Sequence, residues 1–341
     1  VERDGERTAY DTRFVLVATG SVPREIPIAP VDGERILNSD HALELRRVPD
    51  SLVVLGAGAV GTEFASIYRS FGSDVTLVEM APRLLPIEDE DVSKELLKTY
   101  RKRGIKSLVD TRLESVEKTS DGVRLHLLKG GSTQVLDASA LLVAVGRAPV
   151  SEGLGLDEIG VVRQRGFLEV DEWMRTAVPS VYAIGDVIDT PWLAHVASAE
   201  GILAAEHMAG HADARPIDYN LVPSCTYCSP EVASVGLTEA KARERGHDVQ
   251  CGTFPFSALA KAAILQHAGG FVKVVRETRY DEILGVHIIG PHATDLIAEA
   301  CVAMGVESTA EELARTMHAH PTLSESVVEA AHAAVGHAIH F

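Results

Sequence analysis

The sequence is poor in cysteine, in positive charge and in long apolar runs, and each shortage excludes a class of protein. Four cysteines among 341 residues do not make the disulfide framework of a small secreted domain. Lys and Arg number 32 against 49 acidic residues, and the formal net charge of −17 argues against nucleic acid or an anionic membrane as the main partner. No apolar run approaches the ~18 residues of a transmembrane helix. We therefore expect a cytoplasmic protein, with no nucleic acid and no membrane as partner.

The length and the apolar content indicate an ordinary globular protein. A chain of 341 residues with 46% hydrophobic residues is long enough for two or three domains with real cores. No signal peptide is visible, but the chain begins with Val1 rather than methionine, so this says little about the native start.

Residues 53–79 contain the most informative pattern. A short apolar run leads into Gly56, Gly58 and Gly61 at GxGxxG spacing, and an amphipathic stretch predicts a helix up to Gly72. A second strand then ends at Glu79, 23 positions after Gly56. This order predicts a dinucleotide-binding unit whose glycines admit a pyrophosphate and whose acid accepts hydrogen bonds from a ribose and repels a 2′-phosphate.

Two ten-residue segments resemble each other. Residues 14–23 (FVLVATGSVP) and 140–149 (ALLVAVGRAP) are both apolar strands followed by a glycine and, three residues later, a proline. The second copy follows its own glycine-rich turn, with Gly146 90 residues after Gly56. A duplicated unit predicts an equivalent turn for the first copy, upstream of Val1. We therefore expect the chain to be a fragment.

The rest of the chain predicts ordinary elements of an α/β protein. Residues 88–103 and 195–208 are predicted as helices, and 271–276 with 283–289 as a hairpin. Residues 294–304 predict a helix, and Ser308 with Glu311 matches a capping box that opens another. Asp186 ends a buried strand, where it either holds a cofactor hydroxyl or caps the following turn.

The segment 318–325 (HAHPTLSE) contains the predicted proton-transfer chemistry. His320 precedes a proline, which excludes it from helical geometry, and Glu325, five residues later, would supply a carboxylate to its ring. Proton transfer from an unperturbed thiol to an imidazole starts about two pKa units, or ~2.7 kcal/mol, uphill, and a carboxylate that stabilises the imidazolium narrows that gap. Thr322 and Glu325 also match a capping box, so Glu325 could equally serve a helix start.

The remaining cysteines and histidines give no convincing site. Cys225 and Cys228 have CxxC spacing, but in a predicted strand they face opposite sides, and no helix start follows to activate a thiol. Cys251 and Cys301 are predicted as core residues. No metal-ligand spacing appears among His287, His292, His332, His337 and His340.

With these motifs in place, the chain resembles the pyridine nucleotide–disulfide oxidoreductases over its whole length. The resemblance rests on ATGS (18–21), GAGAVGTE (56–63), VGRAP (145–149), AIGD (183–186), LAH (193–195), PEVASVG (230–236) and residues 318–325. Leu323 and Glu79 favour the NAD-linked branch that oxidises dihydrolipoyl groups. The resemblance implies two Rossmann-like nucleotide-binding domains, the first incomplete, and a C-terminal α+β dimerisation domain.

The resemblance also implies domain bounds and site residues. Residues 1–48 and 147–215 would belong to the FAD domain, 49–146 to the NAD domain and 216–341 to the dimer interface. NAD would lie on Gly56, Ala57, Gly58, Ala59, Val60, Gly61, Thr62, Glu63, Glu79, Leu113 and Gly146. FAD would lie on Ala18, Thr19, Gly20, Asp186, Trp192, Leu193, Ala194 and His195. His320, paired with Glu325, would be the acid/base that serves the other subunit's disulfide.

The implied reaction passes electrons from dihydrolipoyl thiols through a disulfide and FAD to NAD. The implied partners are a second copy of the chain and the lipoyl-bearing acyltransferase of a 2-oxo acid dehydrogenase complex. The family's cysteine pair and its FAD-binding GxGxxG are both missing from the sequence, so we expect the 341 residues not to be active alone. The alternatives are another NAD(P)-linked flavin disulfide or mercuric reductase, or a non-catalytic NAD-binding subunit.

Overall fold

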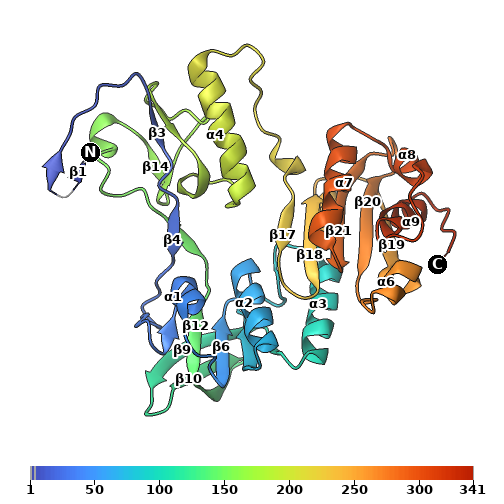
Figure 1. The fold of residues 1–341 in the computed structure, drawn as a ribbon, viewed down its shortest axis with the longest axis horizontal. Helices are drawn as coiled ribbons and strands as arrows, with labels where there is room; N and C mark the ends of the chain where they lie inside the picture. The colour runs from blue at the N-terminus through green and yellow to red at the C-terminus, as the bar shows by residue number, and fades with distance from the viewer. Residues whose placement is uncertain (1, 4, 341) are drawn as a thin grey trace. The chain divides into compact units, whose positions relative to one another are not determined.

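The computed structural model describes residues 2, 3 and 5–340, which divide into two compact units. Of the described residues, one unit comprises those up to 22 together with 147–219, and the other comprises 23–146 and 220–340 (Figure 1). None of the helices among the described residues has the length and apolarity needed to cross a membrane.

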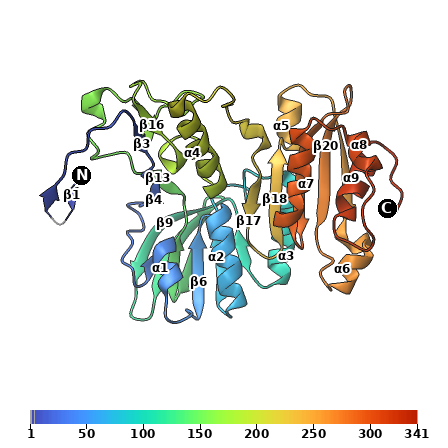
Figure 2. The same cartoon turned by 45° about the horizontal axis from the view of Figure 1, so that its top comes forward.

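The larger unit contains the predicted dinucleotide-binding sheet. Its five parallel strands run in the order β5 (Ile36–Leu37), β12 (Ala140–Val143), β6 (Ser51–Leu55), β7 (Asp74–Val78) and β8 (Lys106–Leu108). The side chains of β5, β12, β6 and β7 are mostly apolar and buried, because both faces of a parallel sheet are covered, whereas the edge strand β8 is half-buried or exposed. Figure 2 shows α1 (Ser39–Glu44) and α2 (Ala59–Ser70) beside the sheet. An antiparallel sheet of β9 (Thr111–Lys118), β10 (Val123–Lys129) and β11 (Ser132–Ala138) completes this half.

The compact units differ from the expected domain bounds: residues 216–219 lie in the smaller unit, and the expected NAD and interface domains share the larger one. Residues 23–48, which the resemblance assigns to the FAD domain, lie in the unit of the parallel sheet. The reason is that Ile36 and Leu37 of β5 pair with Leu141 and Leu142 of β12 and become an edge strand. The bounds of the functional domains remain predictions.

The C-terminal half of the same unit is an antiparallel sheet with helices. The strands run in the order β17 (Ser224–Thr226), β18 (Glu231–Gly236), β21 (Ile283–Gly290), β20 (Phe271–Glu277) and β19 (Val249–Pro255). The helices α7 (Ala293–Gly305) and α9 (Glu325–Ala334) pack on one face, where Val274, Val286 and Ile288 are buried (Figure 1). The shorter helices are α5 (Glu239–Glu244), α6 (Ala260–Ile264) and α8 (Ala310–Arg315).

The other face of this sheet meets α3 (Glu90–Lys102) of the dinucleotide half. Here Val232 and Ile289 share an apolar core with Leu96 of α3. The same face has a polar row across all five strands, because Ser224, Ser234, His287, Lys273 and Thr253 are successive partners in register. The alternating hydrophobic pattern of each strand does not reveal this row, since it depends on how the strands are aligned.

The smaller unit is built from short strands around one long helix. The strands β3 (Val15–Val17) and β16 (Val181–Ala183) pair in parallel, and α4 (Ala194–Ala209) follows. The remaining strands are β1 (Glu2–Arg3), β2 (Glu6–Arg7), β4 (Ser21–Pro23), β13 (Arg147–Pro149), β14 (Arg163–Gln164) and β15 (Phe167–Leu168). Leu156, Leu168, Met174, Val187 and Leu203 are among its buried core residues.

Most predicted elements appear within two residues of their expected ends, and the fold class is confirmed. The predicted helix 88–103 is α3, and the predicted hairpin is β20 with β21. The capping box at 308–311 was displaced by one residue. Thr309 is the N-cap of α8 and its Oγ1 accepts from the Glu312 N–H, because Asp281 already accepts the Glu311 N–H at 2.7 Å.

Candidate functional site

The glycine-rich turn between β6 and α2 is too tight for side chains at two of its three glycines. Gly56 has φ of +101°, and a Cβ there would lie 2.4 Å from the Ala144 carbonyl oxygen. At Gly61 a Cβ would lie 1.9 Å from the Gly56 oxygen. At Gly58, in contrast, a Cβ would meet no atom within 4 Å. Gly58 therefore borders open space, as required where a backbone approaches a ligand closely.

The start of α2 offers hydrogen-bond donors to that space. Gly58 is the N-cap of this twelve-residue helix and makes no side-chain cap, so Ala59 and Val60 begin the helix with their N–H groups uncapped. Thr62 donates its hydroxyl back to the Gly58 oxygen at 2.7 Å, which holds the first turn. Helix N-termini with this geometry bind phosphate groups. The residues present therefore fit the pyrophosphate of a dinucleotide.

Glu79 is anchored to the same turn. Its Oε2 accepts the Ala57 N–H at 2.6 Å and its Oε1 accepts the Ala81 N–H at 2.7 Å. Each carboxylate oxygen has a second lone pair, so the half-buried side chain can still accept from two ribose hydroxyls. The structure thus places together the glycines and the acid that the sequence pattern connected.

The other predicted NAD residues lie in different surroundings. Glu63 of α2 accepts the Tyr227 N–H at 2.7 Å, and burial raises its pKa although that bond opposes the rise. Leu113 is 5% exposed and belongs to an apolar core cluster. Gly146 has φ of +109°, and its oxygen accepts the Arg24 N–H at 3.0 Å. Their contact with NAD remains a prediction.

A pair of glycine substitutions tests whether the glycine-rich turn between β6 and α2 binds a nucleotide. We expect Gly58→Ala to leave the unfolding free energy within about 1 kcal/mol, since its φ of −70° suits alanine, but to lower NAD+ affinity more than tenfold by filling the ligand space. Gly61→Ala should instead destabilise the unit itself. Calorimetric titration with NAD+ and urea unfolding measure the two effects. Equal NAD+ affinity in wild type and Gly58→Ala would contradict this site.

The predicted FAD residues of the smaller unit gather around the ends of β3 and β16. Thr19 donates its hydroxyl to the Val150 oxygen at 2.5 Å, and Gly20 has φ of +70° with open space where a Cβ would stand. Asp186 follows β16 and accepts the Ser21 hydroxyl at 2.5 Å through Oδ2. Ala18 directly follows β3. The open backbone at Gly20 beside a part-exposed carboxylate fits a hydroxylated cofactor.

The N-terminus of α4 lies in the same unit. Leu193 is its N-cap and makes no side-chain cap, so Ala194 and His195 form the first helical turn. Trp192 precedes it, with its ring centroid 5.5 Å from that of Phe167 and its indole N–H donated to the Ile188 oxygen. An uncapped helix start with an adjacent flat apolar surface is compatible with a flavin. These roles remain predictions.

Sequence reasoning missed the contribution of Arg147. Its Nε donates to the Ser21 hydroxyl at 2.6 Å, its Nη2 donates to the Ser21 oxygen at 2.7 Å, and it lies 3.8 Å from Asp186. This guanidinium orients the carboxylate that is predicted to bind FAD. The sequence did contain a signal for this contact, because Arg147 belongs to the motif VGRAP and Ser21 to the motif ATGS.

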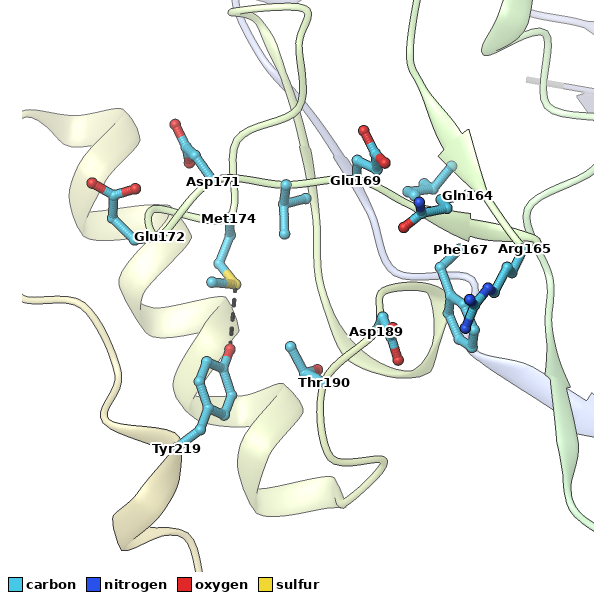
Figure 3. A pocket seen from close by; sticks show the side chains of 12 residues that line it. Gln164, Arg165, Phe167, Glu169, Asp171, Glu172, Met174, Asp189, Thr190 and Tyr219 are labelled. Atoms are coloured by element: carbon cyan, nitrogen blue, oxygen red, sulfur yellow. Dashed lines mark hydrogen bonds between the residues drawn. The ribbon is translucent and has the colours of Figure 1, made fainter. Parts of the chain in front are cut away.

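A cavity of about 500 Å³ opens elsewhere in the smaller unit (Figure 3). Figure 3 shows carboxylates of Glu169, Asp171, Glu172 and Asp189 around it, with Tyr219 below Met174. The Tyr219 hydroxyl donates to the buried Glu200, and burial together with that carboxylate raises the Tyr219 pKa. None of the predicted site residues lines this cavity.

The histidine–carboxylate pair forms as the sequence suggests. His320 Nδ1 lies 2.8 Å from Glu325 Oε1, while Glu325 Oε2 accepts the Thr322 N–H at 2.8 Å. Burial raises the pKa of Glu325, but these bonds outweigh it and hold the pKa below its usual value. Glu325 therefore serves the loop before α9 and the His320 ring at once, so the two interpretations left open by the sequence are compatible.

The four cysteines are not suited to thiol–disulfide exchange. Cys228 is buried, and burial raises its pKa to about 12. Burial likewise raises the pKa of Cys251 to about 12 and raises those of Cys225 and Cys301. Thiols of this kind are poor nucleophiles at neutral pH. Among the residues that the structure describes, no group of three or more His, Cys, Asp or Glu is placed to hold a metal ion.

The fold and the cradle define a nucleotide-binding oxidoreductase architecture, and comparison with known families makes the assignment specific. Residues 1–201 match the pyridine nucleotide-disulphide oxidoreductase family, and residues 222–331 match the dimerisation domain of the same family. The chain belongs to this family.

Similar proteins support the assignment. The chain is 46% identical to dihydrolipoyl dehydrogenase of Bacillus subtilis over 96% of its length and 69% of that protein. It is 43% identical to dihydrolipoyl dehydrogenase of Mycobacterium leprae over 96% of its length and 70% of that protein. The crystal structure of LpdA from Mycobacterium tuberculosis is 32% identical with a TM-score of 0.89, covering 96% of this chain and 71% of that one.

Proposed function

We propose that the chain is part of a dihydrolipoyl dehydrogenase, whose intact form oxidises dihydrolipoyl groups with FAD and NAD+ as cofactors. The single observation that carries this proposal is the His320–Glu325 pair, because a nucleotide cradle alone would suit many activities. Similarity to dihydrolipoyl dehydrogenases at 40–46% identity favours this activity over mercuric or other disulfide reductases.

The His320–Glu325 pair can take up or release a proton at one atom, His320 Nε2. With Nδ1 facing Glu325, the ring exchanges protons through Nε2, and the imidazole is 71% exposed. The carboxylate stabilises the imidazolium that forms when Nε2 takes a thiol proton. Glu325 holds the ring in this orientation because its own position is secured by the Thr322 N–H and by α9. The resulting thiolate is the nucleophile of thiol–disulfide exchange.

The remaining residues bind and orient the cofactors. The start of α2 would hold the NAD pyrophosphate, and Glu79 would hold the adenosine ribose and repel a 2′-phosphate. Asp186, oriented by Arg147 and Ser21, would hold an FAD hydroxyl. When bound, FAD would supply a two-electron acceptor and NAD+ a hydride acceptor.

The proposal includes partners and a source of the disulfide. The family's dimerisation domain supports a homodimer. Because none of the four cysteines is suited to exchange, we infer that cysteines outside this sequence provide the redox disulfide. We further propose that the protein is cytoplasmic. Its proposed partner is the lipoyl-bearing acyltransferase of a 2-oxo acid dehydrogenase complex.

A substrate and cofactor comparison tests the function. In the intact, disulfide-bearing protein, dihydrolipoamide should drive reduction of NAD+ at least tenfold more efficiently than reduction of NADP+, since Glu79 disfavours a 2′-phosphate. Absorbance at 340 nm measures both rates. Activity with mercuric ion or another disulfide, but none with dihydrolipoamide, would contradict the proposal. Cofactor binding without any turnover would favour a non-catalytic subunit.

A further inference from the structure

A second histidine–carboxylate pair lies beside the first, although the sequence gives His340 no role. His340 Nδ1 is 2.6 Å from Glu329 Oε1, much as His320 Nδ1 is 2.8 Å from Glu325 Oε1. Glu325 and Glu329 are four residues apart in α9, so their side chains share one face of the helix. The imidazoles of His340 and His320 are 69% and 71% exposed. The two pairs therefore have the same construction, one helical turn apart.

Glu329 creates an electrostatic problem for Glu325. The Glu329 side chain is 11% exposed, and its Oε2 is buried without a hydrogen-bond partner among the described residues. A buried carboxylate of this kind is costly to ionise unless a cation compensates it. A second negative charge one turn away also favours protonation of Glu325. A protonated Glu325 would hold the His320 ring less strongly.

The other cations on elements packed against α9 have partners other than Glu329. Helix α9 packs on β19, β20 and α8. Arg276 of β20 pairs with Asp281 at 2.8 Å and donates to the Ala334 oxygen at the end of α9 at 3.1 Å, and Arg315 of α8 pairs with Glu311 at 2.6 Å. The remaining charged or titratable groups on these elements and the tail are Cys251, Lys273, Glu277, Glu312, His332 and His337. His340 is the imidazole that contacts Glu329 directly.

The electrostatics of Glu325 agree with this arrangement. Burial raises its pKa, while the bond from the Thr322 N–H, the contact with His320 and the charge of His340 lower it further than burial raises it. His340 thus acts on Glu325 across the helix face without contacting it in a hydrogen bond.

We propose that His340 is a positioning residue for the acid–base pair: held by Glu329, it offsets the charge of that carboxylate and so favours the ionised form of Glu325 that orients His320. This inference rests on the proposed function, because it deepens the role of the same pair. It assigns the C-terminal tail an electrostatic task in addition to packing.

Titration of Glu325 tests the proposal directly. The side-chain carboxyl carbon of Glu325 is followed by ¹³C NMR against pH in the 341-residue chain. We expect His340→Ala to raise the titration midpoint by a few tenths of a pH unit, because the Glu329 charge is no longer compensated. The double variant His340→Ala with Glu329→Gln should restore the wild-type midpoint, since both charges are gone. The matched control His337→Ala removes another tail imidazole and should change nothing.

The outcomes separate this inference from the proposed function. An unchanged midpoint in His340→Ala would overturn the inference, and so would a double variant that fails to restore it, since a tail that only packs is disturbed in both. Circular dichroism confirms that the variants fold. In the intact protein, the acid limb of the kcat/KM profile should move in the same direction as the midpoint. If the Glu325 midpoints change as expected but the intact protein does not oxidise dihydrolipoamide, the proposed function fails and the inference about His340 stands.

Discussion

Replacing His320 with glutamine in the intact, disulfide-bearing protein is expected to lower turnover with dihydrolipoamide and NAD+ by about 10²–10⁴-fold at neutral pH. Glutamine fills much of the same space and can still contact Glu325, but it cannot take up a thiol proton. Steady-state kinetics at saturating NAD+ measure the loss. The control His126→Gln changes a histidine of β10 in the dinucleotide half and should keep full activity.

The pH dependence adds a second criterion. Glu325 has a lowered pKa, so the stabilising contact with His320 is present above the ordinary value of 4.5 and is lost only as the pH falls through the lower native value. Glu325→Gln should therefore impair turnover across the neutral range. Because the histidine is still present, the impairment should be smaller than in His320→Gln. Wild-type turnover in His320→Gln would show that the pair moves no catalytic proton.

Lys273→Met is expected to lower the free energy of unfolding by about 3–5 kcal/mol. Lys273 is 3% exposed, and its Nζ lies 3.0 Å from Asp89, 2.7 Å from Asp91 and 2.9 Å from Glu239. Asp89 is equally buried, so methionine would leave its carboxylate without a compensating cation. Urea unfolding of the 341-residue chain measures the effect.

A surface pair provides the matched control. Lys106 pairs with Asp74 at 3.2 Å, but both side chains are more than half exposed. Lys106→Met should therefore change the unfolding free energy by less than about 1 kcal/mol. Equal effects of the two substitutions would show that the buried cluster does not hold the dinucleotide half against the C-terminal sheet.

The cluster also predicts how stability depends on pH. The bond from Lys273 lowers the pKa of Glu239 to about 2, although burial opposes it. A carboxyl with a lowered pKa stabilises the fold above its ordinary value of 4.5, and that stability is lost as the pH falls towards 2. Burial lowers the pKa of Lys273, but its three carboxylates raise it overall, so its contribution is lost only above the ordinary 10.5. Lys273→Met should flatten the acid side of this profile.

Local patterns predicted most of the secondary structure and the nucleotide cradle. The run from Val53 to Glu79 specifies a strand, a tight turn, a helix and a second strand within 27 residues, and all its interactions are close in sequence. The backbone limits at Gly56 and Gly61 allow few other conformations, which explains why the spacing was informative. The His320–Glu325 contact also spans five residues, within reach of a single loop and helix start.

Contacts between distant segments could not be read in this way. Lys273 and Asp89 are 184 residues apart, and the polar row that includes Lys273 exists only because five strands are aligned in one register. Arg147 reaches Ser21 across 126 residues. Even the shorter His340–Glu329 contact depends on the tail turning back on α9 after Gly336, which has φ of +86°.

The sequence by itself determined the family, the glycine turn with its acid and the histidine–carboxylate pair, because each depends on residues within one strand, turn or helix. The tertiary structure alone decided which charges compensate one another: Lys273 between the two halves of the larger unit, Arg147 beside Asp186, and His340 on Glu329. Electrostatic partners are chosen by distance in space and by burial, and neither is encoded in the local spacing of residues.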